Sequence, residues 1–167
     1  MPFVYRVGMP TCLTVFADAS FDHGSGIAAF AGWFRAAAST HKISKVSKRR
    51  FVSSNEAELV ALCATVLVAL RRQACFRDGD FVVAKSDCLY AVERLKNKTG
   101  GTTETEHRMV AKVHAALQAH GLRFYVRHVK GHTKLPEPRF HVNRWCDGEA
   151  RTLLRQAVRK ERENRPM

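Results

Sequence analysis

The chain has 167 residues, of which 46% are hydrophobic and 26% charged, as in an ordinary globular protein with one core. Its 28 Lys and Arg residues outnumber its 15 Asp and Glu residues, and the net charge of +13 indicates an anionic partner, with nucleic acid ahead of an acidic membrane surface. No stretch approaches the roughly 20 apolar residues of a membrane span, and no apolar export signal opens the sequence, so we expect a soluble protein that is not exported.

We therefore expect a single domain over residues 1–167, with a core at about 11–158 and a charged C-terminal tail that frays from Arg159. The five cysteines are scattered and form no Cys-x-x-Cys pair, which argues against a zinc ribbon or a disulfide framework. Free thiols are typical of a reducing compartment, so we expect a cytoplasmic monomer without a membrane partner.

The first half of the sequence predicts three strands in a meander. Residues 13–17 form a short apolar strand that ends at Asp18, and the glycine-bearing stretch 20–26 predicts a hairpin connection. A second strand is expected over 27–34 and a third over 41–52. The third strand carries a basic stripe, which suits phosphate contacts or protection of a sheet edge equally well; it consists of Lys42, Lys45, Lys48, Arg49 and Arg50.

The second half alternates strands with helices. Apolar residues at helical spacing predict a helix over 55–72, with Ser53 and Glu56 as a capping box. Further elements are expected as a strand at 81–86, helices at 89–96 and 104–120, a strand at 122–129, a loop at 130–142, and a last helix from Asn143. This order predicts an α/β fold with a five-stranded mixed sheet, three antiparallel meander strands plus two parallel strands, flanked by helices.

Four carboxylates stand where strands of this sheet meet helices: Asp18, Glu58, Asp87 and Asp147. Three of them lie in or directly after apolar runs, where an ionised side chain is unfavourable unless something pairs with it. Each aspartate alone has an ordinary explanation, as a turn or cap residue for Asp18 and Asp87 and as a first-turn helix acid for Asp147. Together they indicate a site for divalent metal.

Five motifs occur in a fixed order, and with them the chain resembles type 1 ribonuclease H. They are Asp18-Ala-Ser20 after a strand, Asn55-x-x-Glu58-Leu59 opening a helix, Ser86-Asp87 after a strand, Val129-Lys-Gly-His132 in a loop, and Asn143-x-x-Cys146-Asp147 in a helix. The resemblance covers about residues 11–154 and implies a ribonuclease H-like fold. The connection between the two middle helices is short, so the chain resembles the forms that lack a basic handle.

The resemblance implies the chemistry of an endoribonuclease. Asp18, Glu58, Asp87 and Asp147 would bind two Mg²⁺ ions, with Mn²⁺ as a possible substitute, and His132 would move protons from a mobile loop. The expected reaction is two-metal-ion hydrolysis of the RNA strand of an RNA–DNA hybrid, leaving 5′-phosphate and 3′-hydroxyl ends.

Residues beside these motifs would contact the hybrid substrate: Ala19, Ser20, Ser53, Ser54, Asn55 and Asn143. Asn143 would also orient the His132 loop or the helix start. The chain departs from the family pattern at Ala19, where glycine is usual, at Leu89, where glutamine often touches substrate, and in an insertion over 135–140.

Two other functions on the same fold remain open at this point. One is a non-catalytic binder of hybrids or other nucleic acids, which is disfavoured because four carboxylates weaken binding to phosphates. The other is a nuclease that acts on DNA structures such as junctions, against which the Lys-Gly-His loop argues.

Overall fold

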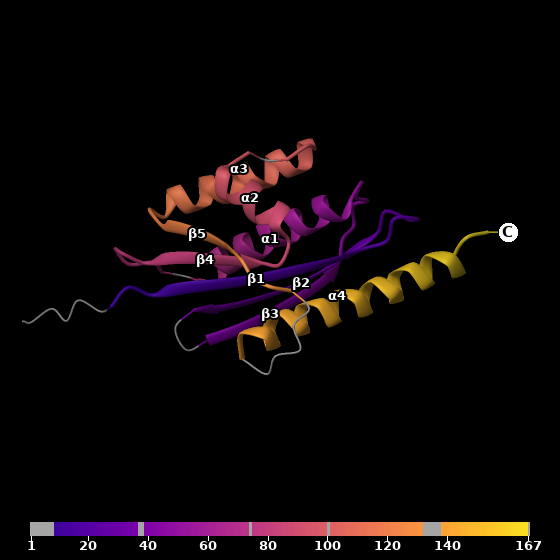
Figure 1. Cartoon of the computed structure of the whole chain (residues 1–167), viewed down its shortest axis with the longest axis horizontal. Coiled ribbons are helices and arrows are strands. Elements are labelled where there is room, and N and C mark those ends of the chain that lie inside the picture. The colour runs from indigo at the N-terminus through magenta and orange to yellow at the C-terminus, as the bar shows by residue number, and fades with distance from the viewer. Residues whose placement is uncertain (1–8, 37–38, 74, 100, 132–137, 167) are drawn as a thin grey trace, which may run out of the picture.

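The computed structural model of the chain describes residues 9–36, 39–73, 75–99, 101–131 and 138–166. Figure 1 shows its elements, which follow one another as β1 (Cys12–Phe21), β2 (Ala28–Ala36), β3 (Ser39–Val46), α1 (Ser54–Arg72), β4 (Phe81–Ser86), α2 (Leu89–Asn97), α3 (Glu104–Ala119), β5 (Arg123–His128) and α4 (Pro138–Glu163).

The strands form one mixed sheet with the order β3-β2-β1-β4-β5. β1, β2 and β3 pair antiparallel, whereas β4 pairs parallel to β1 and β5 parallel to β4. α1, α2 and α3 lie on one face of the sheet, and α4 covers the other (Figure 1). The predicted fold class, a five-stranded mixed sheet flanked by helices, is confirmed.

β1 lies at the centre of the sheet and is buried on both faces. Leu13 and Val15 point to the side of α1, in the same apolar cluster as Leu59 and Leu62. Phe16 points to the other side, against Cys146, Ala150 and Ala31. The side chains alternate because successive residues of a strand face opposite sides. An aspartate in the middle of such a strand therefore needs a specific environment.

Two predicted boundaries are wrong in ways that bear on function. β1 does not end at Asp18 but continues to Phe21, so Asp18 lies within the strand. The last helix begins at Pro138 rather than Asn143, because a proline fits the first turn of a helix, where its missing N–H is not needed. Asn143 and Asp147 thus lie inside the helix, and residues 138–142 of the predicted loop are helical, while residues 132–137 lie outside the described part of the chain.

The C-terminal tail is helical further than expected. α4 continues to Glu163 rather than fraying from Arg159. Arg159 and Glu163 form an ion pair of 2.8 Å one turn apart, and Arg50 reaches Glu161 from the end of the basic stripe at 3.1 Å. These ion pairs hold the last turns of α4, and the sequence pattern did not predict them.

The predicted capping box of α1 is only half correct. The Ser53 hydroxyl accepts the N–H of Glu56 at 3.1 Å. The Glu56 carboxylate, however, accepts the N–H of Val52 at 2.8 Å and the hydroxyl of Thr103 at 2.9 Å. Thr103 is itself the N-cap of α3, where it forms a complete capping box with Glu106. Glu56 therefore ties the starts of two helices together.

All five cysteines are free, as expected, and Cys63 and Cys146 are buried in the two apolar layers. Within the described ranges, no helix combines the length and the apolar character needed to pass through a lipid bilayer.

Candidate active site

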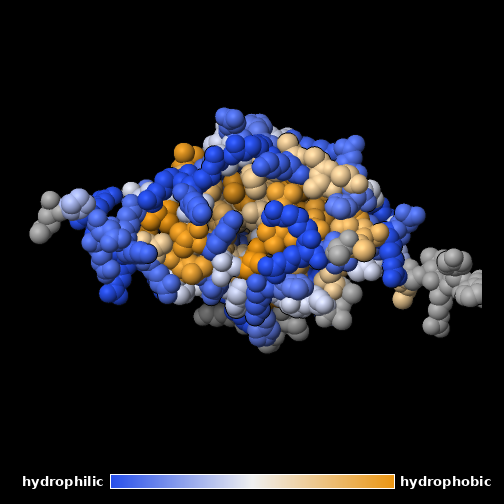
Figure 2. All heavy atoms as spheres, turned by 180° about the vertical axis from the view of Figure 1, so that it is seen from behind, coloured by the Kyte–Doolittle hydropathy of each residue, from blue (hydrophilic) through white to orange (hydrophobic). Residues whose placement is uncertain are grey.

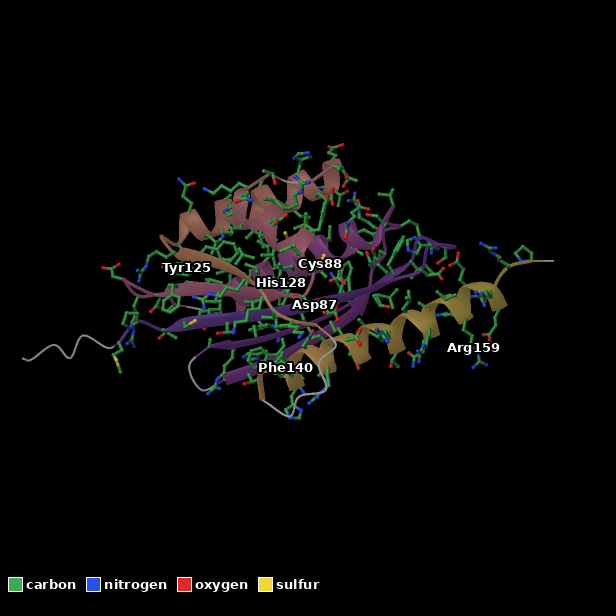
Figure 3. The ribbon with its side chains drawn as sticks, in the orientation of Figure 1. Asp87, Cys88, Tyr125, His128, Phe140 and Arg159 are labelled. Carbon is green, nitrogen blue, oxygen red and sulfur yellow. The ribbon has the colours of Figure 1, made fainter. Side chains whose placement is uncertain are left out.

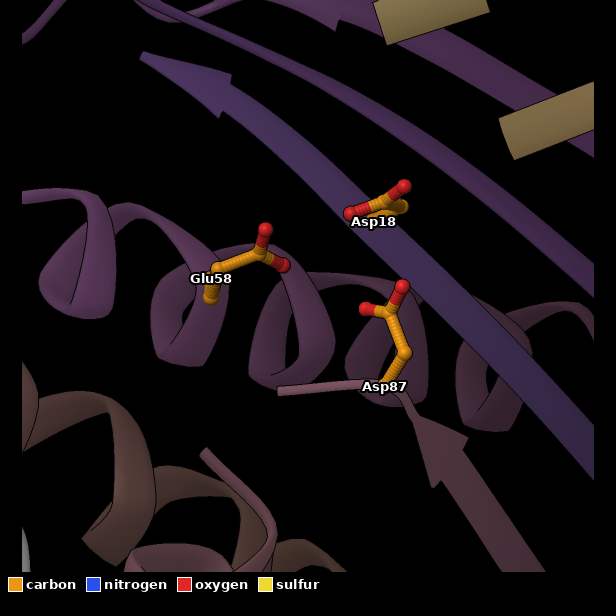
Figure 4. A group of neighbouring side chains, drawn as sticks. All are labelled: Asp18, Glu58 and Asp87. Carbon is orange, nitrogen blue, oxygen red and sulfur yellow. The ribbon is translucent and has the colours of Figure 1, made fainter. Parts of the chain in front are cut away.

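Three of the four predicted carboxylates converge at one end of the sheet (Figure 4). Asp18 comes from β1, Glu58 from the second turn of α1, and Asp87 from the segment directly after β4. Each offers a carboxylate oxygen, and these oxygens lie within 4.8 Å of one another. The three elements are far apart in sequence, so only the folded chain creates this group.

The site lies where β1 and β4 part. Their pairing ends at Phe16 and Lys85, whereas the pairing of β1 with β2 continues to Phe21. Beyond Phe16 the β4-facing edge of β1 has lost its strand partner. There the backbone N–H of Ala19 donates to Asp18 Oδ1 at 2.9 Å and to Glu58 Oε2 at 3.1 Å. A backbone group freed by the parting of the strands thus orients two carboxylates.

Burial and mutual repulsion disturb the acidity of this group. Asp18 is 4% exposed, and burial together with the charge of Asp87 raises its pKa to about 7. Burial and the neighbouring Asp18 raise the pKa of Glu58 well above its usual range. Carboxyl groups whose pKa values are raised in this way are typical of a functional site, and a cation between them would relieve the repulsion.

Asp87 is fixed by the chain on both of its sides. After β4, the Ser86 hydroxyl accepts the N–H of Cys88 at 3.1 Å and turns the chain. A ring nitrogen of His128, at the end of β5, lies 3.0 Å from the carbonyl oxygen of Asp87, and Figure 3 shows the two residues side by side. Gly131 passes so close to the Asp87 carboxylate that an added Cβ would lie 3.1 Å from Cγ.

The fourth carboxylate stands apart from this group. Asp147, on α4, forms an ion pair with Arg151 at 2.9 Å. It does not belong to the group of three carboxylates whose oxygens lie within 4.8 Å of one another. Its charge nevertheless contributes to the raised pKa of Asp18, after burial and Asp87, which places it on the α4 side of the site. Its role as a metal ligand stays a prediction.

The remaining predicted site residues fall into different environments. His132 lies outside the described residues. Ser53 serves as the N-cap of α1, while Ser54 and Asn55 are exposed one turn before Glu58. Ala19 and Ser20 are partly exposed.

Asn143 is buried. It is 5% exposed, and its Oδ1 has no hydrogen-bond partner in the described part of the chain. It lines a cavity of about 300 Å³ between α4 and the sheet, together with Phe16 and Trp33. Its predicted roles, as a substrate contact and in orienting the His132 loop or the helix start, stay predictions.

Three contributors to the site were missed by reasoning from the sequence. They are the N–H of Ala19, the close approach of Gly131 to Asp87, and the pairing of Arg151 with Asp147. The i,i+4 spacing of Asp147 and Arg151 on a predicted helix was the one available signal. The other two depend on where strand pairing ends and where a loop passes.

The donor set fits a divalent metal ion. Carboxylate oxygens are the ligands that Mg²⁺ prefers, and it commonly binds through a few of them while keeping water or substrate phosphate in its remaining positions. Asp18, Glu58 and Asp87 supply such oxygens around one point. Burial is the largest cause of the raised pKa values of Asp18 and Glu58, and repulsion between the crowded carboxylates adds to it. This repulsion favours a bound cation as it favours a proton.

Comparison with solved structures places the fold. The N-terminal RNase H domain of rv2228c from Mycobacterium tuberculosis, solved as a fusion with maltose-binding protein, is 16% identical with a TM-score of 0.65, over 90% of this chain and 99% of that one. LC11-RNase H1, solved in complex with an RNA/DNA hybrid, is 14% identical with a TM-score of 0.67, over 87% and 99%. RNase H1 from Halobacterium salinarum NRC-1 is 16% identical with a TM-score of 0.60, over 87% and 98%.

These neighbours define a ribonuclease H fold. The family model for RNase H matches residues 10–155, and the chain therefore belongs to the RNase H family. No curated protein sequence matches the chain.

Proposed function

We propose that this protein is a ribonuclease H that hydrolyses the RNA strand of RNA–DNA hybrids within the strand. The observation that carries the proposal is the convergence of Asp18, Glu58 and Asp87 at the parting of β1 and β4, in a chain of the RNase H family. A structural neighbour solved with an RNA/DNA hybrid supports the substrate class. The net charge of +13 suits a polyanionic substrate.

The proposal assigns Asp18, Glu58 and Asp87 to hold divalent cations, with Asp147 joining them from α4 as a fourth ligand. Two Mg²⁺ ions, or Mn²⁺ in their place, would supply activation of the attacking water and neutralisation of charge at the reacting phosphate. The Ala19 N–H fixes the direction of the Asp18 and Glu58 carboxylates. His132 is assigned proton transfer, and the products would carry 5′-phosphate and 3′-hydroxyl ends.

Contacts with the substrate are proposed on both sides of the carboxylates. Ser54 and Asn55 are exposed one turn before Glu58, and Ala19 and Ser20 directly follow Asp18. Short polar side chains and backbone groups at these positions suit 2′-hydroxyl groups, which distinguish RNA from DNA and are read across a shallow minor groove without regard to sequence.

The test is cleavage of a hybrid whose RNA strand carries a 5′ label, with Mg²⁺, with Mn²⁺ and with EDTA. Asp18→Asn is compared with Asp80→Asn, because both aspartates are buried but Asp80 only accepts backbone N–H groups of Thr11 and Arg77. We expect metal-dependent cutting of the RNA strand, lost by at least about 10³-fold in Asp18→Asn and kept in Asp80→Asn. A 5′-phosphate-dependent exonuclease then identifies the product ends.

A substrate panel separates the proposal from its alternatives. Duplex RNA, duplex DNA and a four-way DNA junction are tested beside the hybrid. Preferred cutting of the junction would identify a nuclease for DNA structures. Tight, salt-sensitive binding of the hybrid without turnover in either metal would identify a non-catalytic binder.

A further inference from the structure

α4 carries a row of arginines that no part of the proposed chemistry uses. Arg151, Arg155, Arg159 and Arg162 are all exposed, and we refer to these four as the arginine ridge. At 3.6 residues per turn they fall within about 80° of one another around the helix axis, and at 1.5 Å per residue they extend over about 16 Å. The opposite side of α4, with Cys146 and Ala150, packs on the sheet.

The arginine ridge begins at the candidate active site. Its first member, Arg151, pairs with Asp147 at 2.9 Å. Its other members continue along α4 toward the C-terminal end, where Arg159 lies on the side of the helix away from the sheet (Figure 3). That end of the molecule, on the left when seen from behind, is covered by hydrophilic side chains (Figure 2).

The ridge also borders an open groove beside the β1–β2 hairpin. Arg155, Arg159 and Arg162 line this groove, of about 380 Å³, together with Asp22, Leu154, Val158 and Glu163. Two acids face the arginines there. Glu163 pairs with Arg159 at 2.8 Å, with both side chains exposed, and Asp22 is held mainly by hydrogen bonds from Ser25, at 2.8 Å from its N–H and 2.7 Å from its hydroxyl. The local charge therefore stays positive.

Ion pairs within the helix compensate only part of this row. Arg151 pairs with Asp147 and Arg159 with Glu163, each one turn apart, whereas the ion pairs among the described residues include neither Arg155 nor Arg162. Like charges spaced three or four residues apart weaken a helix by about 0.2–0.5 kcal/mol per pair. Arg151 with Arg155, Arg155 with Arg159, and Arg159 with Arg162 are three such pairs in succession. A row of arginines that is only partly compensated within its own helix suits an external counter-charge, and an arginine guanidinium can donate two parallel hydrogen bonds to phosphate oxygens.

We propose that the arginine ridge binds backbone phosphates of the nucleic-acid duplex beside the cleavage position. This rests on the proposed function, which places the reacting phosphate at the carboxylates next to Arg151. The ridge then holds the part of the duplex that extends from the carboxylates past the β1–β2 hairpin. Phosphate contacts of this kind position a duplex without reading its sequence.

The test measures binding rather than cleavage, so that it is independent of turnover. In an Asp18→Asn background, the triple variant Arg155→Gln, Arg159→Gln, Arg162→Gln is compared with the triple variant Lys96→Gln, Lys98→Gln, Lys112→Gln. The control removes the same charge from exposed positions on α2, directly after α2 and on α3, on the other face of the sheet. Affinity for a fluorescent hybrid is followed by anisotropy over a range of KCl concentrations.

We expect the ridge variant to weaken binding about 10- to 100-fold near 0.1 M salt, and to reduce the slope of log K against log salt by about two to three. The control should change affinity by less than about threefold. Equal losses in both variants, or a loss without a change in salt slope, would overturn the proposal. Binding to anionic lipid vesicles that the ridge variant alone loses, with hybrid binding intact, would also overturn it.

Circular dichroism checks that α4 remains folded, which is expected since glutamine and arginine have similar helix propensity. If the triple variant unfolds, Arg155→Gln alone is tested and should still lower the salt slope by about one. Absence of cleavage by the wild type would remove the proposed function while leaving this binding result interpretable.

Discussion

Asp147 and Arg151 lie one turn apart on α4 and form an ion pair of 2.9 Å, so the fourth carboxylate of the site is held by the first arginine of the ridge. Both side chains are partly exposed, at 28% and 50%. A metal ion that recruits Asp147 has to compete with this guanidinium.

Arg151→Gln should therefore raise the affinity for Mg²⁺. Exposed ion pairs contribute about 0.2–1 kcal/mol, which corresponds to an increase of up to about fivefold. Isothermal calorimetry without nucleic acid measures it, and Arg155→Gln, which removes the same charge one turn further on, is the matched control. An equal increase in both variants would show that the pair itself does not matter.

The stability of the metal-free protein should depend on pH through Asp18. Its pKa is raised from 3.8 to about 7, so between these values the folded state holds a proton that the unfolded state has released. The free energy of unfolding must then fall as pH rises through this window, and the raised pKa of Glu58 acts in the same direction.

Asp18→Asn should reduce this slope and raise the free energy of unfolding at pH 8 by about 1–3 kcal/mol in EDTA. Urea denaturation at a series of pH values measures both. Parallel curves for wild type and variant would contradict the prediction. Saturating Mg²⁺ should stabilise the wild type more than the variant at pH 8.

Asp80 should give stability the opposite dependence on pH. Hydrogen bonds from the backbone of Arg77 and Thr11 lower its pKa, so the stability that it contributes is present above the usual value of 3.8 and is lost as pH falls through the lowered value. Asp80→Asn should destabilise the protein by about 1–3 kcal/mol at neutral pH. Hybrid cleavage by the folded variant should stay within about twofold of wild type. A loss of activity at a low temperature, where the variant is still folded, would contradict this prediction.

Gly131 tests how closely the loop must approach Asp87. An added Cβ would contact the Asp87 carboxylate, including Cγ at 3.1 Å, so Gly131→Ala should displace this carboxylate. We expect hybrid cleavage to fall about 10- to 100-fold with a small change in Tm. Gly148→Ala is the control, because nothing lies within 4 Å of the Cβ it adds. It should leave cleavage intact and raise the stability of α4.

Gly32 tests the packing of α1 on the sheet. A Cβ at Gly32 would lie 2.5 Å from Thr65 Oγ1 and 2.6 Å from Thr65 Cγ2. Gly32→Ala should therefore destabilise the protein by about 1–3 kcal/mol. Adding Thr65→Ala removes both clashing atoms, so the double variant should recover at least about 1 kcal/mol relative to the sum of the single changes. Chemical denaturation of the four proteins measures this coupling, and strict additivity would show that the clash is absorbed elsewhere.

Local patterns in the sequence predict much of this fold. The limits of β4 agree with the predicted 81–86, because an apolar run between a turn and a polar segment is a local signal. α1 and α3 agree within one residue at each end for the same reason. The start of α4 was missed because Pro138 stops a strand or an inner helical turn but fits a first turn, and sequence alone does not tell these apart.

The residues of the candidate site could be predicted from the sequence, but the contacts between them could not. Asp18, Glu58 and Asp87 follow from the order of the motifs, and the structure brings them together. That Ala19 orients two of them depends on β4 ending its pairing at Lys85, and the position of Asp147 depends on its choice of partner. Such contacts form between segments that are distant in sequence, and neither segment carries a local sequence pattern that would predict them.

The hydrogen bond from Thr103 to Glu56 gives the connection between α2 and α3 an influence on distant chemistry. Glu56 lies in the first turn of α1, two residues before Glu58, and its carboxylate is anchored by the residue that caps α3. A shift of this connection would pull on the first turn of α1 and so turn Glu58 relative to Asp18. The connection between α2 and α3 would thereby affect the reaction without contacting the metal or the nucleic acid. A change in its length would alter the rate of cleavage while the carboxylates stay the same.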